Sequence, residues 1–443
     1  MRRRAGSLCG RAALCLAAAF LLQANSPAAS AQSGDRDRLP PGVKERLIPD
    51  RFPAQPTIAP AFSIPVDPLG FSAPNRDYMG DRIAMASLDF IGEDKLLFTF
   101  RVPGLLHRDM DNADEGEREI RAVVLDLPQG TVEAEQVWTL HDRSRYLWML
   151  RDGHFLLRDR NELLEGDPSL NLKPALKFPG PLLWVEMDPT QQYLVTNSSE
   201  PAPAKPKIGD TGSATAAAPS MDLEDRINEA SPEIVVRILK RETGTVILLS
   251  RVRSAVHLPI NDLGYVDDIE GNGWQRIVNL NYFDGGSRVL GSITSSCELR
   301  DDFVAPRLIM STGCASNGAD KLVAMNTDGK VLWVDDTPDV AIWPELTMAP
   351  NGLRIARETL GMTHPINSSS PIDPDDVKGQ WVTVYDSATG NLALETPASP
   401  VLDAGGNVAI SPSARRVAVI NAGAIQVFEL PAAPPLPATA QDK

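Results

Sequence analysis

Long apolar runs are scarce in this 443-residue sequence, and helical periodicity is nearly absent. After residue 31, no stretch approaches the roughly 20 uninterrupted apolar residues that a membrane-spanning helix needs. We therefore predict that the mature chain has no membrane span. Short strand-like runs recur instead, separated by turns rich in Gly, Asn, Asp and Pro, and this pattern indicates an all-β fold.

Motifs that mark common hydrolases and metalloproteases are also missing. The sequence contains neither a G-x-S-x-G elbow nor an H-E-x-x-H helix. Loops far apart in a β-propeller can still assemble a site around its centre, so the missing motifs do not exclude one. No two of the five histidines have metal-ligand spacing in the sequence: His107, His141, His154, His257 and His364.

Positive charge is in short supply. The chain has 43 lysines and arginines against 58 acidic residues, a formal net charge of −15, and losing residues 1–31 with their four arginines would change it to −19. Such an excess repels phosphate backbones and anionic lipid, so we predict no nucleic-acid partner and no binding to a membrane surface. An acidic surface also keeps an exported protein in solution.

The start of the chain has the layout of a secretory signal. Arginines precede a short apolar run at residues 12–22, and Ala29, Ser30 and Ala31 place small residues where a signal peptidase requires them. We therefore predict a signal peptide at residues 1–31, cleavage after Ala31, and a secreted or periplasmic protein.

Cysteine is rare, with four residues in the chain. Cys9 and Cys15 lie in the predicted signal peptide, which leaves Cys297 and Cys314. In an oxidising compartment an even pair favours a disulfide, here between two strand-like runs that could be antiparallel neighbours. Such a bridge could contribute about 3 kcal/mol. The alternative is two buried free thiols.

Two kinds of unit alternate along the sequence. One is a strand, a tight turn ending in Gly and a second strand, and the other is a short turn followed by an apolar strand. A period of roughly 40–50 residues with four strands predicts a β-propeller of about seven blades. The first unit occurs at 123–134, 236–249, 322–334 and 382–394, and the second at 187–197, 348–357 and 410–421.

This pattern divides the chain into regions. We predict an extended Pro-rich arm at 32–84, the propeller at 85–430 and a flexible tail at 431–443. An insert at about 199–230 is rich in Ala, Pro and small polar residues, and we predict that it is disordered because it cannot bury enough apolar area. The predicted blades are 85–144, 145–180, 181–259, 260–297, 298–338, 339–399 and 400–430.

The stretch KLVAMNTDGKVLWVDDTP, residues 321–338, resembles the repeat of pyrroloquinoline-quinone dehydrogenases. The resemblance implies a propeller in which a tryptophan four residues after the turn glycine, here Trp333, locks neighbouring sheets together. The adjacent cysteines that those enzymes use are absent, and no Glu, Asn and Asp set for the quinone's calcium is found, so we expect no quinone cofactor. The same repeats are similar to YVTN and WD-repeat propellers.

One stretch, YVDDIEGNGWQRIV at residues 265–278, suggests a cation site. Asp268, Glu270 and Asn272 fall at alternate positions before Gly273, and alternate oxygens in a tight loop can converge on Ca²⁺. Arg276 stands where similar calcium loops have a further carboxylate. The alternatives are therefore a calcium site and a solvated acidic turn.

Other candidate residues follow from their place in the predicted blades. Asp89, Asp152, Asp284 and Asp403 occupy comparable early positions, where they either ring a central channel or cap turns. The tryptophans recur at nearly blade spacing, as core residues between sheets or as platforms for sugars. They are Trp138, Trp148, Trp184, Trp274, Trp333, Trp343 and Trp381.

These observations predict an exported, non-catalytic propeller that binds a protein, a polysaccharide or a small ligand. The alternative is an enzyme with its site in the central funnel, such as a hydrolase, a lyase or a divergent quinoprotein. Carboxylates or histidines converging within about 5 Å at the channel would favour the enzyme. A wide apolar patch without polar convergence would favour the binding protein.

Overall fold

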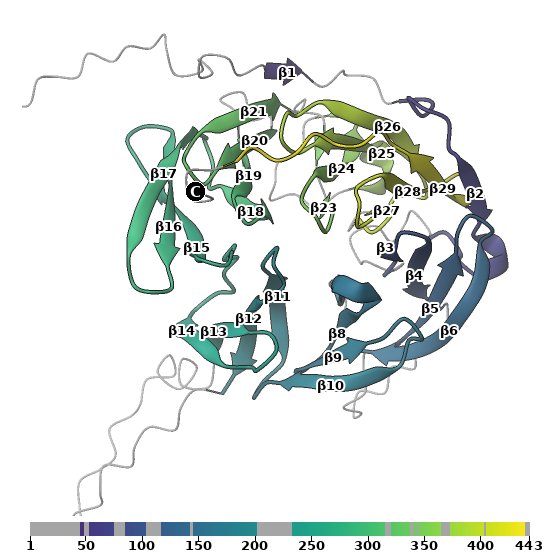
Figure 1. Ribbon diagram of the computed structural model, residues 1–443, viewed down its shortest axis with the longest axis horizontal. Coiled ribbons are helices and arrows are strands. Elements are labelled where there is room, and N and C mark those ends of the chain that lie inside the picture. The colour runs from purple at the N-terminus through teal and green to yellow at the C-terminus, as the bar shows by residue number, and fades with distance from the viewer. Residues whose placement is uncertain are drawn as a thin grey trace, which may run out of the picture. The chain divides into compact units, whose positions relative to one another are not determined.

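Seven β-sheets surround a common centre in the computed structural model of the chain (Figure 1). The prediction of an all-β propeller with about seven blades is therefore confirmed. All described residues belong to the unit formed by residues 40–443. The structure describes residues 45–47, 53–74, 85–102, 117–141, 145–201, 233–314, 320–336, 341–342, 345–364, 373–402 and 405–438.

Within a blade, strands that follow one another in the sequence pair antiparallel from the centre outward. Blades one to three are β3 (Ser87–Gly92), β4 (Lys95–Arg101), β5 (Arg118–Asp126) and β6 (Thr131–Leu140); β7 (Leu147–Met149), β8 (Phe155–Asp159), β9 (Glu162–Gly166) and β10 (Leu172–Lys177); and β11 (Leu182–Met187), β12 (Tyr193–Glu200), β13 (Glu233–Lys240) and β14 (Val246–Val252). Blades four and five are β15 (Gly264–Glu270), β16 (Gln275–Tyr282) and β17 (Ser287–Thr294); and β18 (Arg300–Ala305), β19 (Leu308–Cys314), β20 (Asp320–Asn326) and β21 (Val331–Asp336), to which β1 (Glu45–Leu47) adds in parallel. Blade six is β22 (Ala341–Ile342), β23 (Leu346–Met348), β24 (Arg354–Met362), β25 (Val377–Asp386) and β26 (Leu392–Ala398), and blade seven is β27 (Val408–Ile410), β28 (Arg416–Asn421), β29 (Ala424–Glu429) and β2 (Phe62–Pro65).

Helical structure is confined to short 3₁₀ segments among the described residues. They are η1 (Asp67–Leu69), η3 (Arg151–Gly153) and η4 (Pro374–Asp376). None of the helices in the described ranges is long and apolar enough to cross a membrane.

An early strand completes the last blade. β2 pairs antiparallel with β29, in a register that places Ile64 opposite Ile425, so the seventh sheet joins segments from both halves of the chain. Ile64 is buried in a cluster with Phe98 of blade one. Within the predicted Pro-rich arm at 32–84, residues 62–65 therefore form a strand of the seventh sheet. The strand FSIP has four residues and ends in proline, and nothing in it indicates its distant partner β29.

Trp333 packs between blades five and six, as the quinoprotein resemblance implied. Its indole Nε1 donates a hydrogen bond to the Ser387 carbonyl oxygen at 2.9 Å, and its ring stacks on that of Tyr385 at 5.9 Å between centroids. A Cβ at Gly390, where φ is +68°, would lie 2.7 Å from the indole, so this turn requires glycine. Trp138, Trp148 and Trp381 are also buried.

The predicted disulfide is present between Cys297 and Cys314. Cys297 follows β17 of blade four, and Cys314 ends β19 of blade five. The sequence suggested that the two strand-like runs could be antiparallel neighbours, but they lie in different sheets. β17 pairs with β16, whereas β19 pairs with β18 and β20. The bond therefore links two blades instead of two strands of one sheet.

Removing this disulfide should lower the free energy of unfolding by about 3 kcal/mol, because 17 residues separate the cysteines and the bridge limits the unfolded chain. Urea unfolding of the Cys297→Ser, Cys314→Ser double variant measures the loss. Reductant should reduce the stability of the wild type to that of the variant and leave the variant unchanged. Equal stability of the oxidised wild type and the variant would contradict this prediction.

Several predicted regions fall wholly or partly outside the described residues. These are the signal peptide at 1–31, most of the insert, from residue 202 onward, and the last residues of the tail, 439–443. Residues Ser199 and Glu200, placed in the insert by the sequence, belong to β12. Before residue 439 the predicted tail contacts the propeller, since Leu436 packs against the cluster around Trp333.

Candidate functional site

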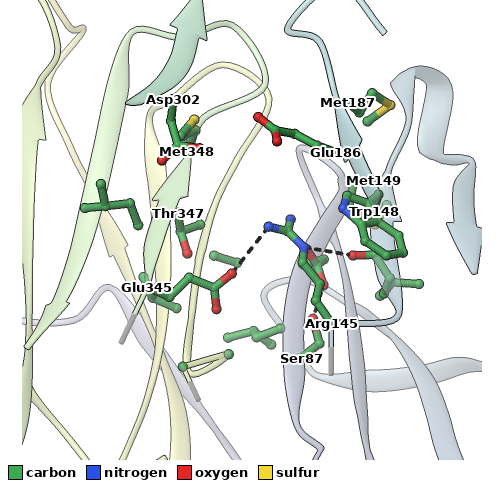
Figure 2. A pocket seen from close by; sticks show the side chains of 18 of the residues that line it. Ser87, Arg145, Trp148, Met149, Glu186, Met187, Asp302, Glu345, Thr347 and Met348 are labelled. Carbon is green, nitrogen blue, oxygen red and sulfur yellow. Dashed lines mark hydrogen bonds and ion pairs between the residues drawn. The ribbon is translucent and has the colours of Figure 1, made fainter. Parts of the chain in front are cut away.

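A cavity of about 750 Å³ lies where the inner strands of the ring face one another. Strands of six of the seven blades line its wall, and the three-stranded blade four contributes only Ile260, just before β15. Figure 2 shows this cavity from close by, with polar and sulfur-containing side chains around it. Its volume lies within the range of sites that hold small molecules, roughly 300–1,000 Å³.

The inner strands supply the polar groups because alternate residues of a strand point to the same face. In β11, Trp184 and Glu186 are such a pair, and in β18 the pair is Arg300 and Asp302. The apolar part of the wall includes Trp148 and four methionines, one of which is Met85. The methionines labelled in Figure 2 are Met149, Met187 and Met348.

Glu186, His257 and Asp302 converge at the cavity wall. Their ligand atoms all lie within 4.8 Å of one another. His257 Nδ1 is 3.1 Å from Glu186 Oε2, and His257 Nε2 is 3.6 Å from Asp302 Oδ1. The edge of the His257 ring meets Trp184 at 5.9 Å between centroids, and Arg300 lies 6.0 Å from the centroid of the same indole. The convergence that would favour an enzyme is therefore present.

The charges of this cluster depend on one another. Burial alone would lower the pKa of His257, but the carboxylates of Glu186 and Asp302 raise it to about 9. Burial raises the pKa of Asp302 to about 6, against the opposing effect of His257. Burial also raises the pKa of the neighbouring Asp301 to about 7, although its carboxylate accepts a hydrogen bond from the Ser311 hydroxyl.

A second set of polar side chains forms an interaction across the cavity. Arg145, just before β7 of blade two, reaches Glu345 of blade six with 3.4 Å between Nη1 and Oε1, as Figure 2 shows. The Arg145 guanidinium also lies 5.7 Å from the centroid of the Trp148 ring. Burial raises the pKa of nearby Asp89 to about 6, although the Ser87 hydroxyl donates a hydrogen bond to its Oδ2 at 2.6 Å.

The sequence identified part of this wall. Asp89 lines the cavity, in line with the alternative that the early-blade aspartates ring a central channel. Asp152 lies in η3 and Asp284 in the turn between β16 and β17, and neither is part of the wall. Asp403 lies outside the described residues. Glu186 and Asp302 were missed. Glu186 is an acidic residue inside the apolar first strand of a blade, and that signal could have found it, whereas Asp302 follows Arg300 and Asp301 and carries no such signal.

The predicted calcium residues lie away from the cavity. Asp268 and Glu270 belong to β15, and Asn272 follows in the turn. The Asp268 carboxylate pairs with Arg276 at 2.5 Å and accepts a hydrogen bond from the Leu299 N–H at 3.3 Å. Glu270 and Asn272 are exposed. Calcium binding by these residues stays a prediction, as does the expectation that no quinone is bound.

Comparison with known proteins finds distant structural similarity only. No family model matches the sequence, and no match was found among curated proteins. A solved acylaminoacyl peptidase from Pyrococcus horikoshii is 12% identical with a TM-score of 0.41, and the alignment covers 76% of this chain and 50% of the peptidase. The propeller domain of the Trilobed protease from Pyrococcus furiosus is also 12% identical, with a TM-score of 0.41 and coverage of 78% and 93%. TolB from Acinetobacter baumannii is 13% identical, with a TM-score of 0.36 and coverage of 70% and 74%. The chain thus spans about half the length of the acylaminoacyl peptidase.

Proposed function

We propose that this chain is an exported binding protein that holds a small ligand in its central cavity. The observation that carries the proposal is the cavity itself, about 750 Å³ and lined by strands of six blades. Pockets of this size with an apolar lining and a few convergent polar groups are the usual form of small-molecule sites. The interblade disulfide supports export, because such bonds persist in oxidising compartments.

The wall favours a ligand that combines polar and apolar parts. Trp184 keeps 37% of its surface exposed, which leaves part of an aromatic ring available for packing. Arg145 and Arg300 can bind acidic or hydroxyl groups of a ligand, and the carboxylates of Glu186 and Glu345 can accept hydrogen bonds from amines or hydroxyls. A small amphiphilic molecule fits this lining better than a flat protein surface or a long polysaccharide.

Filling the cavity should abolish ligand binding. The Thr347→Trp variant places an indole in the cavity wall, whereas Thr139→Trp adds the same side chain to the exposed face of β6. A thermal-shift screen of the wild type against small amines, organic acids, short sugars and dipeptides identifies ligands. We expect hits that disappear in Thr347→Trp and persist in Thr139→Trp. Hits that persist equally in both folded variants would contradict a site in the cavity.

The convergence of Glu186, His257 and Asp302 favours a second candidate, an enzyme that acts on a ligand in the same cavity. Groups with displaced pKa values clustered in a cleft are typical of catalytic sites. The two candidates differ in the fate of the ligand. Mass spectrometry of each hit after incubation with the protein shows an unchanged molecule for a binding protein and a converted one for an enzyme.

A further inference from the structure

Two buried polar atoms, one nitrogen and one oxygen, face each other at the cavity wall. His257 Nδ1 and Glu186 Oε2 lie 3.1 Å apart, close enough for an ion pair but outside hydrogen-bond geometry. Within the described part of the chain, neither buried atom has a hydrogen-bond partner. Other buried atoms of the described residues, Nε2 of His141 among them, are in the same state, so the indication of an ion comes from this contact together with the third ligand atom nearby.

The surroundings of His257 orient it as a ligand. Its Nε2 lies 2.5 Å from the Asp301 carbonyl oxygen, which can only accept a hydrogen bond, so Nε2 carries a proton, and a metal ion would replace the proton that Nδ1 holds in its ion pair with Glu186. Histidines that bind metals usually donate their other N–H to a carbonyl or carboxylate in this manner. The edge contact with Trp184 restricts rotation of the ring.

The spacing and identity of the donors suit one ion. Donors bound to a single Zn²⁺ at about 2.0–2.2 Å lie roughly 3–4 Å apart, and the three ligand atoms here lie within 4.8 Å of one another. One imidazole nitrogen with two carboxylates is a donor set for first-row transition metals, whereas Ca²⁺ prefers oxygen ligands throughout. Arg300 approaches Oδ2 of Asp302 at 4.0 Å, which leaves Oδ1 for the ion.

We propose that Glu186, His257 and Asp302 bind one divalent transition-metal ion, of the Zn²⁺ class, at the wall of the central cavity. Three protein ligands leave a coordination position for water or for an oxygen or nitrogen of a molecule in the cavity, as in open metal sites. The proposal does not rest on the ligand-binding function, because the ion would be bound in the absence of any other ligand.

The test uses the full chain, produced without a histidine tag and treated with a chelator. Titration with Co²⁺ followed by visible absorbance reports coordination directly, and calorimetry with Zn²⁺ gives the affinity and the number of ions. We expect one ion per chain, displacement of Co²⁺ by Zn²⁺, and much weaker binding of Ca²⁺. In Glu186→Gln, Asp302→Asn and His257→Ala the affinity should fall at least about 100-fold.

His141 provides a matched control. It also forms ion pairs with two carboxylates, those of Glu117 and Asp159, but within the described ranges only the Glu186, His257 and Asp302 group brings three ligand atoms together. His141→Ala should therefore bind Zn²⁺ like the wild type. The absence of a Co²⁺ spectrum in the wild type, unchanged affinity in Glu186→Gln, or tighter binding of Ca²⁺ than of Zn²⁺ would each overturn the proposal. Circular dichroism of each variant establishes that it is folded, and the two amide variants retain the shape of the acids.

Discussion

Replacing Arg357 with leucine should lower the free energy of unfolding by about 3–5 kcal/mol, the loss typical when one partner of a buried ion pair is removed. Arg357 of β24 is 0% exposed, and its Nη1 lies 3.0 Å from Oδ2 of Asp335 in β21, which is 2% exposed. The leucine variant would leave the Asp335 carboxylate in the core without its cation. Urea unfolding followed by circular dichroism measures the effect.

The pair joins two blades, and this is the reason for its large expected effect. Asp335 belongs to blade five, whereas Arg357 and Tyr385 belong to blade six. The Tyr385 hydroxyl donates to Asp335 Oδ2 at 2.7 Å and accepts from Arg357 Nη2 at 2.5 Å, and the guanidinium also lies 5.2 Å from the centroid of the Tyr385 ring. Loss of the arginine therefore removes a charge, two hydrogen bonds and packing from one junction.

A double variant separates the cost of an unpaired Asp335 carboxylate from the cost of lost packing. In Arg357→Met, Asp335→Leu both ions are replaced by apolar side chains, and we expect much of the lost stability to return because no unpaired charge remains. Arg145→Met is the matched control, since its guanidinium is 58% exposed and its pair with Glu345 contributes at most about 1 kcal/mol. If Arg357→Leu is no more destabilising than Arg145→Met, the buried pair does not hold the blades together.

The ring of seven blades is predictable because the strands of a blade are consecutive. The Gly turn after β20 and the Trp333 that follows it lie within one short stretch, so a local pattern specifies both the hairpin and the side chain that packs against the next blade. The closing strand is different. The residues of β2 pair with β29 near the other end of the propeller, and no short-range pattern in the sequence records that pairing.

The cluster in the cavity was hidden for a related reason. Glu186, His257 and Asp302 come from β11, the segment after β14, and β18, which are separated by many residues in the sequence. Their proximity depends on how three successive blades are placed around the centre, which spacing along the chain does not give. Asp89 could be found, because the position of a residue within the first strand of a blade does follow from the repeat.

Stability should fall as the pH rises from about 4 to 7, in contrast to proteins whose carboxylates are stabilised by ion pairs. The pKa of Asp89 rises from 3.8 to about 6 on folding, mainly through burial. The folded chain therefore retains a proton that the unfolded chain releases, and this contribution is complete below pH 3.8 and lost as the pH rises through 6. At about 1.4 kcal/mol for a factor of ten, the loss is about 3 kcal/mol.

The groups around Asp89 set the size of this change. Ser87 on the same strand and Arg145 from blade two lower the pKa, whereas Glu345 from blade six raises it, and the buried Tyr146 hydroxyl lies nearby. Asp89→Asn should remove about 3 kcal/mol of the pH dependence and be more stable than the wild type at pH 7. His257, Asp301 and Asp302 titrate as well, so the quantity to compare is the difference between the slopes of variant and wild type.

Glu358 should add to the fall in stability over the same range. It is 0% exposed, and burial followed by repulsion from Glu345 raises its pKa well above the ordinary value, although the Gly406 N–H and the Gln380 amide donate hydrogen bonds to it. Urea unfolding at pH 4.5, 6 and 7.5 should show a flatter profile for Glu358→Gln than for the wild type. Asp167→Asn is the control, because hydrogen bonds from Asn171 lower the pKa of this exposed carboxylate and its replacement cannot flatten the slope. Raised pKa values of Asp89 and Glu358 require the free energy of unfolding to fall as the pH rises. A wild type whose free energy of unfolding rises over this range would therefore contradict them.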